Sequence, residues 1–417
     1  MKEEFIVNKK SCRVCGSAIL TPILSLGELF ISDFVDGAGA TTMRKAPLEL
    51  VLCNDADHGC GLLQLRHTVS HEALYRNYWY RSGMNKTMIV ELHSIASKAE
   101  SLLALKNGDF VLDIGANDGT LLRGYKTDGL GLIGFEPANN LAKWNSVGTT
   151  KIVDDFFKFE AWEREFGKAK AKVITAIAMF YDLDEPNIFV SDVAKCLDKD
   201  GIFIVQMSYL SLMIKENAFD NICHEHLEYY SLLALENLLK RHELEVFDVE
   251  LNDVNGGSFR VYIRHQGQGR GVKIPDGASQ RLAKLRQEEK SLGLNNREVY
   301  DNFVRRVNDI KNKIYGFIKN EVEKGKKIYV YGASTKGNTL LQFFNLDHRL
   351  IKAAAERNPD KWGKKTAGTL IPIISEAEAR AARPEYFLVL PCHFIKEFRE
   401  REIEFLNGGG KFIVPLP

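Results

Sequence analysis

Short apolar runs alternate with amphipathic stretches through the middle of the chain, between residues 109 and 207. The apolar runs have the length of buried strands, and stretches such as 187–197 have helical spacing. Alternation of this kind predicts a parallel sheet with crossover helices. The predicted strands are 109–114, 131–135, 150–153, 172–178 and 201–207.

The pattern continues on both sides of this block. Residues 70–105 have helical spacing, and residues 231–242 predict a helix that precedes further strands. The charged region 280–323 has the composition of long exposed helices. The last ~90 residues begin a second α/β pattern, which predicts a second sheet. The remaining predicted strands are 245–252, 259–264, 328–331, 350–355, 386–390 and 411–414, and the helix of the second block is 339–344.

Charge and hydropathy exclude several classes of protein. The 56 Lys and Arg residues almost balance the 55 Asp and Glu residues, so no strong field draws the chain to nucleic acid or an anionic membrane. No apolar run is as long as a membrane span, and the N-terminus MKEEFIVNKK lacks the apolar core of a signal peptide. We therefore expect a cytoplasmic protein, a monomer or homodimer, with no nucleic-acid or membrane partner.

Four of the seven cysteines lie in the turn-rich first ~70 residues, which is a pattern typical of metal-stapled units. Cys12 and Cys15 form a Cys-x-x-Cys-Gly knuckle, and Cys53 and Cys60 form a looser pair. Four thiolates suit a closed tetrahedral zinc site with a structural role. His58 is a competing ligand, and the alternative is a set of buried free thiols.

The stretch VLDIGANDGT, residues 111–120, combines a strand end with a glycine turn and a helix-like segment at 121–125. Its spacing D-x-G-x-x-x-G differs from the dinucleotide fingerprint and resembles motif I of class I methyltransferases that use S-adenosylmethionine. Gly115 and Gly119 would let the backbone approach the methionine part of the cofactor. Asp113 would lie near its ammonium group.

Acidic and aromatic residues follow the next strands of the same block. Glu136 comes about twenty residues after the turn, the offset of a ribose-binding acid. Asp155 could take the adenine amino group while Phe156 stacks on the ring; we expect Phe157 to belong to the core. The predicted cofactor-binding residues are Asp113, Gly115, Asn117, Gly119, Glu136, Pro137, Asp155, Phe156, Ala178 and Met179.

The run CHEHLEYY, residues 223–230, is the densest group of titratable and aromatic side chains. His224 and His226 are two residues apart, which suits metal ligands on a strand but not the helical H-E-x-x-H spacing. Alternatively, a His can take a proton at neutral pH while a neighbouring Glu orients it. A third interpretation is a pair of structural histidines.

Four motifs in this order resemble the three-domain sugar C-methyltransferases, which act on nucleotide-linked keto-deoxysugars. They are the Cys-x-x-Cys-Gly start, VLDIGANDGT, NICHEHLEYYS and IYVYGASTKGNT. The resemblance implies an α/β protein with a small zinc-binding N-terminal domain (1–72), a class I methyltransferase Rossmann-like domain (73–250) and a second Rossmann-like C-terminal domain (251–417). S-adenosylmethionine and structural zinc would be the cofactors.

The resemblance also implies the reaction. His226, with Glu225 beside it, would remove a proton next to a ketone, and the enolate carbon would take the methyl group. His224 and Tyr78 complete the predicted catalytic group. The chain departs from the family at Cys223, where relatives carry Tyr, and at MFYD (179–182), where several have a His. The tyrosines expected at the sugar are Tyr80, Tyr229 and Tyr230.

The late glycine turn, residues 331–339, is similar to a P-loop but has Asn338 where the P-loop lysine belongs. A turn that enters a helix N-terminus still offers N–H groups to a phosphate. We expect Lys336, Asn338 and Arg357 to bind the nucleotide diphosphate. The alternative is a second sheet that only packs.

Three other functions are compatible with parts of the pattern. The runner-up is O- or N-methylation of a sugar or other small metabolite. An RNA methyltransferase would need a basic stripe, which the balanced charge does not supply. A non-catalytic S-adenosylmethionine-binding protein would not need the intact H-E-H run.

Overall fold

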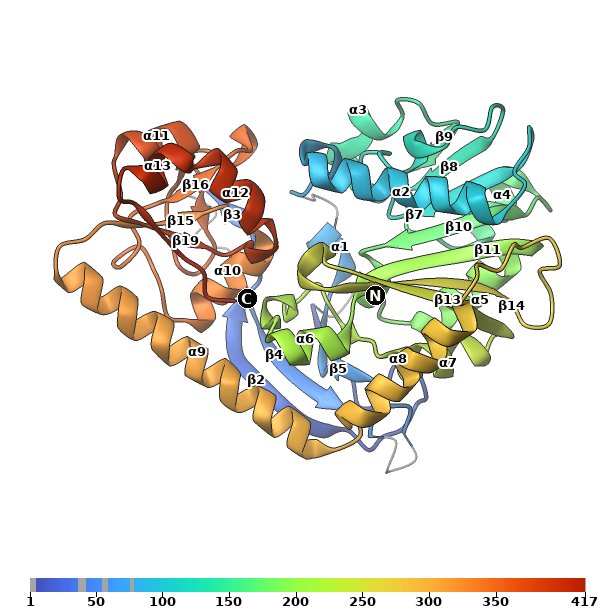
Figure 1. Cartoon of the computed structure of the whole chain (residues 1–417), viewed down its shortest axis with the longest axis horizontal. Coiled ribbons are helices and arrows are strands. Elements are labelled where there is room, and N and C mark those ends of the chain that lie inside the picture. The colour runs from blue at the N-terminus through green and yellow to red at the C-terminus, as the bar shows by residue number, and fades with distance from the viewer. Residues whose placement is uncertain (1–4, 37–42, 55–58, 76–78, 417) are drawn as a thin grey trace.

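The computed structural model describes residues 5–36, 43–54, 59–75 and 79–416. Three units meet around a common centre (Figure 1): an N-terminal β unit in blue, a central α/β unit in cyan to yellow, and a C-terminal α/β unit in orange to red. The long helix α9 (Arg297–Glu323) runs below the C-terminal unit and connects it to the others.

The central unit is built on a seven-stranded sheet in the order β13-β14-β11-β10-β7-β8-β9. The five strands from β9 to β11 are parallel, and the last two pair antiparallel. All five strands predicted between 109 and 207 are confirmed. The strands are β7 (Phe110–Ile114), β8 (Gly131–Phe135), β9 (Lys151–Val153), β10 (Ala171–Ile177), β11 (Leu197–Ser208), β13 (Leu244–Asn252) and β14 (Ser258–His265). The sheet thus continues past the predicted boundary at residue 250.

Residues that alternate along these strands face two different helix layers. Val111 and Val173 pack with Leu92 and Ile95 on one face, under α2 (Lys86–Leu102). Leu112 and its neighbours pack on the other face, in the same core as three cysteines of the N-terminal unit. The helices that contribute to this second layer are α4 (Phe159–Phe166), α5 (Pro186–Cys196), α7 (Leu232–Lys240) and α8 (Ala278–Leu292).

Two helix predictions near the glycine turn are wrong in extent. The segment expected at 121–125 forms a single 3-10 turn, Leu122–Gly124. A Cβ on Gly124 would lie 3.0 Å from the His93 Cα, so α2 packs closely against this turn. The helical region 70–105 is divided into α1 (His71–Tyr75), a 3-10 turn and α2, which Asn85 caps by accepting from Thr87 N.

The N-terminal unit contains a sheet that the turn-rich composition did not predict. Its order is β12-β5-β4-β2, and β12 (Glu228–Tyr229) belongs to the H-E-H run. That run therefore lies where the N-terminal and central units meet. The other strands of this unit are β1 (Ile6–Asn8), β2 (Thr21–Phe30), β3 (Phe34–Val35), β4 (Lys45–Leu52), β5 (Leu63–Leu65) and β6 (His67–Val69).

The C-terminal unit has a five-stranded, all-parallel sheet in the order β18-β16-β15-β19-β20. Its first helix, α10 (Thr335–Phe343), begins earlier than the predicted residue 339, because Ser334 caps it by accepting from Gly337 N. The strands are β15 (Ile328–Tyr331), β16 (Ala354–Glu356), β18 (Ile373–Ser375), β19 (Tyr386–Val389) and β20 (Lys411–Ile413). The short strand β17 (Lys365–Thr366) pairs with β3, and the last helices are α11 (Glu376–Ala381), α12 (Ile395–Arg401) and α13 (Ile403–Asn407).

The predicted region 280–323 is confirmed as two helices, α8 and α9. Glu289 of α8 is buried and accepts from the Tyr209 hydroxyl and from the backbone N–H groups of Leu232 and Leu233. It therefore satisfies the free N-terminal donors of α7. Within the described part of the chain, every helix is too short or too polar to cross a bilayer.

Candidate active site

One cavity of about 880 Å³ joins the central and C-terminal units. Residues that follow β7, β8 and β10 line one side, and residues that follow β15, β16 and β19 line the other. Parallel α/β sheets bind ligands at this carboxyl edge, and here two such edges face each other. The H-E-H run contributes Glu225 and His226 to the wall between them.

The glycine turn after β7 lines the cavity through Gly115 and Asn117. Gly115 has φ +71°, and a Cβ there would lie 3.1 Å from Met179 Cγ, so only glycine fits without strain. Glu136, at the end of β8, accepts from Asn117 N at 2.7 Å and from Ala138 N at 2.9 Å. Burial raises the pKa of Glu136 to about 7. The acid thus holds the turn and still presents its carboxylate to the cavity.

Seven of the ten predicted cofactor residues line the cavity, and three lie outside it. Asp113 is buried under the turn, where Thr175 donates to it at 2.6 Å and burial raises its pKa to about 7. Gly119 faces Arg123 and the Asn145 carbonyl, and exposed Asp155 accepts from the Phe156 backbone. The seven that line the cavity are Gly115, Asn117, Glu136, Pro137, Phe156, Ala178 and Met179.

The turn also holds a segment that we did not connect with it from the sequence. Ser82 N donates to Asn117 Oδ1 at 2.9 Å, and Gly83 N donates to Asp118 Oδ2 at 2.7 Å. This brings Tyr80, predicted to bind substrate, to the cavity wall. The Asn-Asp pair inside VLDIGANDGT is the only signal that could have indicated the contact. Tyr78 lies outside the described residues.

His226 has the geometry of a base. Its Nδ1 lies 2.8 Å from the Asn221 carbonyl oxygen, which can only accept, so Nδ1 carries the proton and Nε2 keeps its lone pair. The ring packs on Tyr181 with centroids 4.2 Å apart. Burial, followed by the charge of Lys336, lowers the pKa of His226 well below its ordinary value. The imidazole is therefore neutral at pH 7.

Three carboxyl groups that the charge of Lys336 also reaches line the same cavity: Asp182, Asp220 and Glu225. Burial raises the pKa of each, most strongly that of Asp182. Asp182 Oδ1 and Glu225 Oε2 are buried without a hydrogen-bond partner in the described structure. Buried polar atoms without a hydrogen-bond partner in the protein can bond to polar atoms of a ligand.

Four predicted residues are buried beside the cavity and do not line it. His224 Nε2 lies 3.0 Å from the Ala46 carbonyl and joins the H-E-H run to β4. Tyr229 donates to the His226 carbonyl at 3.1 Å and supports the loop from behind. Tyr230 lies deep in the core with the cysteines, and Asn338 donates to the Asp33 carbonyl at 3.4 Å. Their surroundings are those of structural residues.

The C-terminal glycine turn repeats the arrangement of the first turn. Glu356, at the end of β16, accepts from Ala333 N at 2.9 Å and from Asn358 N at 2.9 Å. Lys336 and Arg357 line the cavity, as predicted for a ligand site. Lys336, however, points to the central unit, where its Nζ lies 2.5 Å from Asn221 Oδ1.

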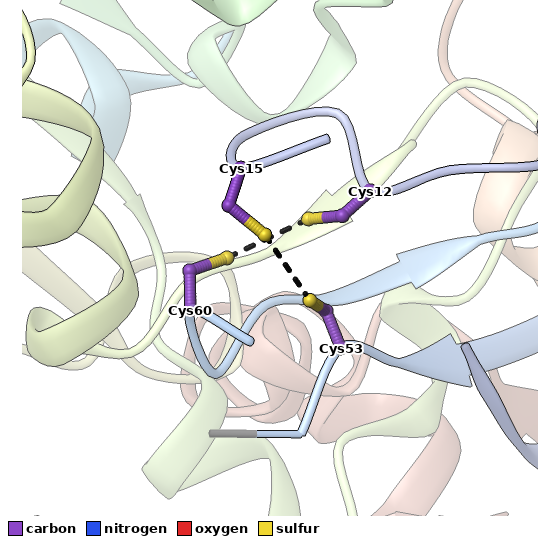
Figure 2. A group of neighbouring side chains, drawn as sticks. All are labelled: Cys12, Cys15, Cys53 and Cys60. Carbon is purple, nitrogen blue, oxygen red and sulfur yellow. Dashed lines mark hydrogen bonds between the residues drawn. The ribbon is translucent and has the colours of Figure 1, made fainter. Parts of the chain in front are cut away.

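The four predicted metal ligands come together in the N-terminal unit (Figure 2). Their sulfur atoms all lie within 4.8 Å of one another, with Cys12 and Cys60 3.5 Å apart and Cys15 and Cys53 3.4 Å apart. Zn–S bonds of about 2.3 Å place the sulfurs of a tetrahedral site roughly 3.8 Å apart. The cluster therefore fits a four-thiolate zinc site with no open position. His58 lies outside the described residues.

Three family models cover almost all of the chain. They are described as "Putative zinc binding domain" (residues 12–75), "Methyltransferase domain" (residues 84–249) and "C-methyltransferase C-terminal domain" (residues 253–417). The chain is also 31% identical over 411 residues to C-methyltransferase NovU of Streptomyces niveus, which covers 97% of this chain and 95% of NovU.

Solved structures match less of the chain. The PH0226 protein of Pyrococcus horikoshii OT3 is 12% identical and covers 45% of this chain and 95% of its own, with a TM-score of 0.36. Magnesium protoporphyrin IX methyltransferase of Synechocystis PCC 6803 with bound SAM is 10% identical and covers 43% and 79%, with a TM-score of 0.31. These partial likenesses carry no conclusion about the activity.

The sheet, the glycine turn with its acid and the matching central domain define a methyltransferase that uses S-adenosylmethionine. The cysteine cluster is its structural zinc site. With the similarity to NovU over nearly its whole length, the chain belongs to the family of three-domain C-methyltransferases.

Proposed function

We propose that the substrate is a nucleotide-linked keto-deoxysugar and that His226 is the base that activates it. The observation that carries the proposal is the contact between His226 Nδ1 and the Asn221 carbonyl, because it leaves Nε2 as a lone pair in the cavity wall. A neutral imidazole is the form that can accept a proton. The low pKa of His226 keeps it in that form at neutral pH.

The reaction then follows from the acidity of a C–H bond next to a ketone. His226 takes the proton, and the electron pair of the C–H bond moves toward the ketone oxygen to form an enolate. Bound S-adenosylmethionine supplies an electrophilic methyl group on a sulfonium sulfur. Glu225 and Asp182, with unpaired buried oxygens beside His226, would bind and orient the sugar ring.

The C-terminal turn supplies the site for the nucleotide part. Thr335 and Lys336, at the N-terminus of α10, line the cavity, and backbone N–H groups at a helix N-terminus bind phosphate. Arg357 is half-exposed at the same edge and could pair with a diphosphate. A sugar attached to this diphosphate would lie between the two sheets, beside His226.

The test is the position of the new methyl group. The protein is incubated with ¹³C-methyl-labelled S-adenosylmethionine and a panel of nucleotide-linked keto sugars, and the products are followed by NMR. We expect the label to be bonded to carbon, with carbon–carbon coupling to the sugar ring. A label on oxygen or nitrogen would instead support an O- or N-methyltransferase. No transfer to any keto sugar would overturn the substrate proposal.

A further inference from the structure

Lys336 belongs by sequence to the C-terminal turn, but its charge lies at the reactive end of the cavity. It is on the first turn of α10, and its Nζ is 2.5 Å from the side-chain oxygen of Asn221. The backbone oxygen of the same Asn221 accepts from His226. The ammonium thus contacts the side chain and the imidazole the backbone of the same residue, and both Lys336 and His226 line the cavity.

Among the described residues Lys336 forms no ion pair within 4 Å, although its charge opposes the burial that raises the pKa of the carboxyls Asp182, Asp220 and Glu225, and adds to the burial that lowers the pKa of His393. Its hydrogen-bond partner is an amide oxygen, which carries no full charge. The other cations on the C-terminal side of the cavity are paired with carboxylates. They are Lys361 with Glu356, and Arg357 and Arg401 with Glu397.

Among the described residues, the His226 loop and the neighbouring 3-10 turn include no Lys or Arg. From the 3-10 turn after β10 come Tyr181 and Asp182, and from its own loop come Asp220, Cys223 and Glu225. An ionised carboxylate repels an oxyanion, and a protonated carboxyl can donate a hydrogen bond but carries no positive charge. Lys336 is therefore the group best suited to an anion that forms beside His226.

We propose that the Lys336 ammonium group donates a hydrogen bond to the ketone oxygen of the substrate and stabilises the enolate that forms when His226 removes the neighbouring proton. The proposal rests on the keto-sugar function above. In this step the C–H bond breaks, an N–H bond forms at His226 Nε2, and the electron pair leaves a negative charge on the oxygen. An ammonium N–H is a strong donor to such an oxyanion.

This assignment differs from the expectation that Lys336 binds the diphosphate. A phosphate ligand would make Lys336 important for nucleotide affinity. An enolate ligand makes it important for proton removal, with little effect on binding of the nucleotide alone. The two roles are therefore separable by experiment.

The experiment compares Lys336→Met, Lys336→Arg and the wild-type protein. Solvent deuterium exchange at the carbon next to the ketone is measured by NMR on saturating keto sugars, without S-adenosylmethionine. Affinity for UDP and dTDP alone is measured by calorimetry. Lys396→Met is the matched control, since Lys396 is on α12 and does not line the cavity.

We expect Lys336→Met to slow exchange about 100-fold, the size of the loss when one oxyanion donor is removed. Lys336→Arg should recover part of the rate, and affinity for the diphosphates should stay within about twofold. Lysine at this place also lowers the pKa of His226. Its removal should therefore move the acidic limb of the exchange rate to higher pH, an effect that mere loss of packing would not produce.

Two results would overturn the inference. Unchanged exchange with diphosphate affinity reduced tenfold or more would return Lys336 to the phosphate site. Equal losses in Lys336→Met and Lys336→Arg, with an unmoved pH profile, would make its role structural. If instead the wild-type protein exchanged no proton of any keto sugar, the proposed function would fail before Lys336 was tested.

Discussion

The central and C-terminal units share one structural feature, a glycine turn held by an acid, but the chain after the turn differs between them. In each, a glycine turn follows the middle strand of a parallel sheet, and an acid at the end of the neighbouring strand holds that turn. Glu136 accepts from Asn117 N and Ala138 N, and Glu356 accepts from Ala333 N and Asn358 N. Both acids line the common cavity.

The two units differ in the segment that comes after the turn. After the first turn the chain forms a single 3-10 turn, and Asn117 and Asp118 hold the segment Ser82–Met84 against it. After the second turn a regular helix, α10, begins at once and carries Lys336 into the central unit. The first turn is therefore covered by a segment of its own unit, whereas a side chain that follows the second turn contacts the other unit. The same arrangement of strand, glycine turn and acid is thus compatible with two roles: binding a cofactor, or placing a charged side chain in the cavity. The segment after the glycine decides which role is possible.

Removal of zinc should have the largest effect on stability, because the N-terminal unit packs against both the central and the C-terminal unit. Cysteines of the zinc cluster share a core with the central sheet, while Leu48 and Leu50 share a core with α10. Structural zinc contributes on the order of 10 kcal/mol in small domains. For a chain of this length, loss of even about 4 kcal/mol lowers Tm by roughly 5 °C. Scanning calorimetry of the protein treated with a chelator, and of the Cys15→Ser variant, measures this fall in Tm.

A zinc-free protein that kept its Tm and bound both ligands normally would contradict a structural role for the cluster. Cys196→Ser is the control, since Cys196 is a buried cysteine outside the cluster.

Neutralising Glu136 and Glu356 one at a time should affect the affinities for S-adenosylmethionine and for nucleoside diphosphate separately. Glu136→Gln should weaken S-adenosylmethionine about tenfold, because a charge-assisted hydrogen bond is worth about 1.5–3 kcal/mol, and leave nucleoside diphosphate binding unchanged. Glu356→Gln should do the reverse. Titration calorimetry of both variants with both ligands gives the four values. If either variant weakened both ligands equally, the two turns would not be independent sites.

The smallest effect is expected at the contact that encloses the first turn. A Cβ on Gly83 would lie 2.7 Å from Asp118 Oδ2, so Gly83→Ala should displace the Trp79–Asn85 side of the cavity and weaken S-adenosylmethionine about fivefold. Gly316→Ala is the matched control, because a Cβ there meets nothing within 4 Å in α9. Equal affinities for the two variants would show that the Asp118 contact does not shape the cofactor site.

Much of the fold was predictable because apolar runs are bounded clearly along the chain. The strands at Gly131–Phe135 and Ile328–Tyr331 were predicted to the residue. The N-terminal sheet was not, since β2 contains Pro22 and Gly27 and pairs with β4 through two register shifts. These interrupt the alternation on which a strand prediction depends.

The site was predictable where it depends on one local motif. The cysteine cluster, and the cavity position of seven of the ten predicted cofactor residues, follow from spacing within a single unit. The position of Lys336 could not be predicted, because its contact with Asn221 joins residues 115 apart in sequence and depends on how two sheets face each other. His224 was predicted to belong to the site from the H-E-H run and Tyr229 from the family resemblance, but they do not line the cavity and contact backbone carbonyls beside it.

Removal of a carbon-bound proton by His226 is the step on which the proposed mechanism depends. Deuterium exchange into nucleotide-linked keto sugars without S-adenosylmethionine measures this step alone, for the wild-type protein and for His226→Asn. We predict exchange next to the ketone in the wild-type protein and a loss of about 1,000-fold in His226→Asn, within the usual range for a general base. Binding of S-adenosylmethionine should be unchanged. Exchange at the wild-type rate in His226→Asn would contradict the role of His226 as the base.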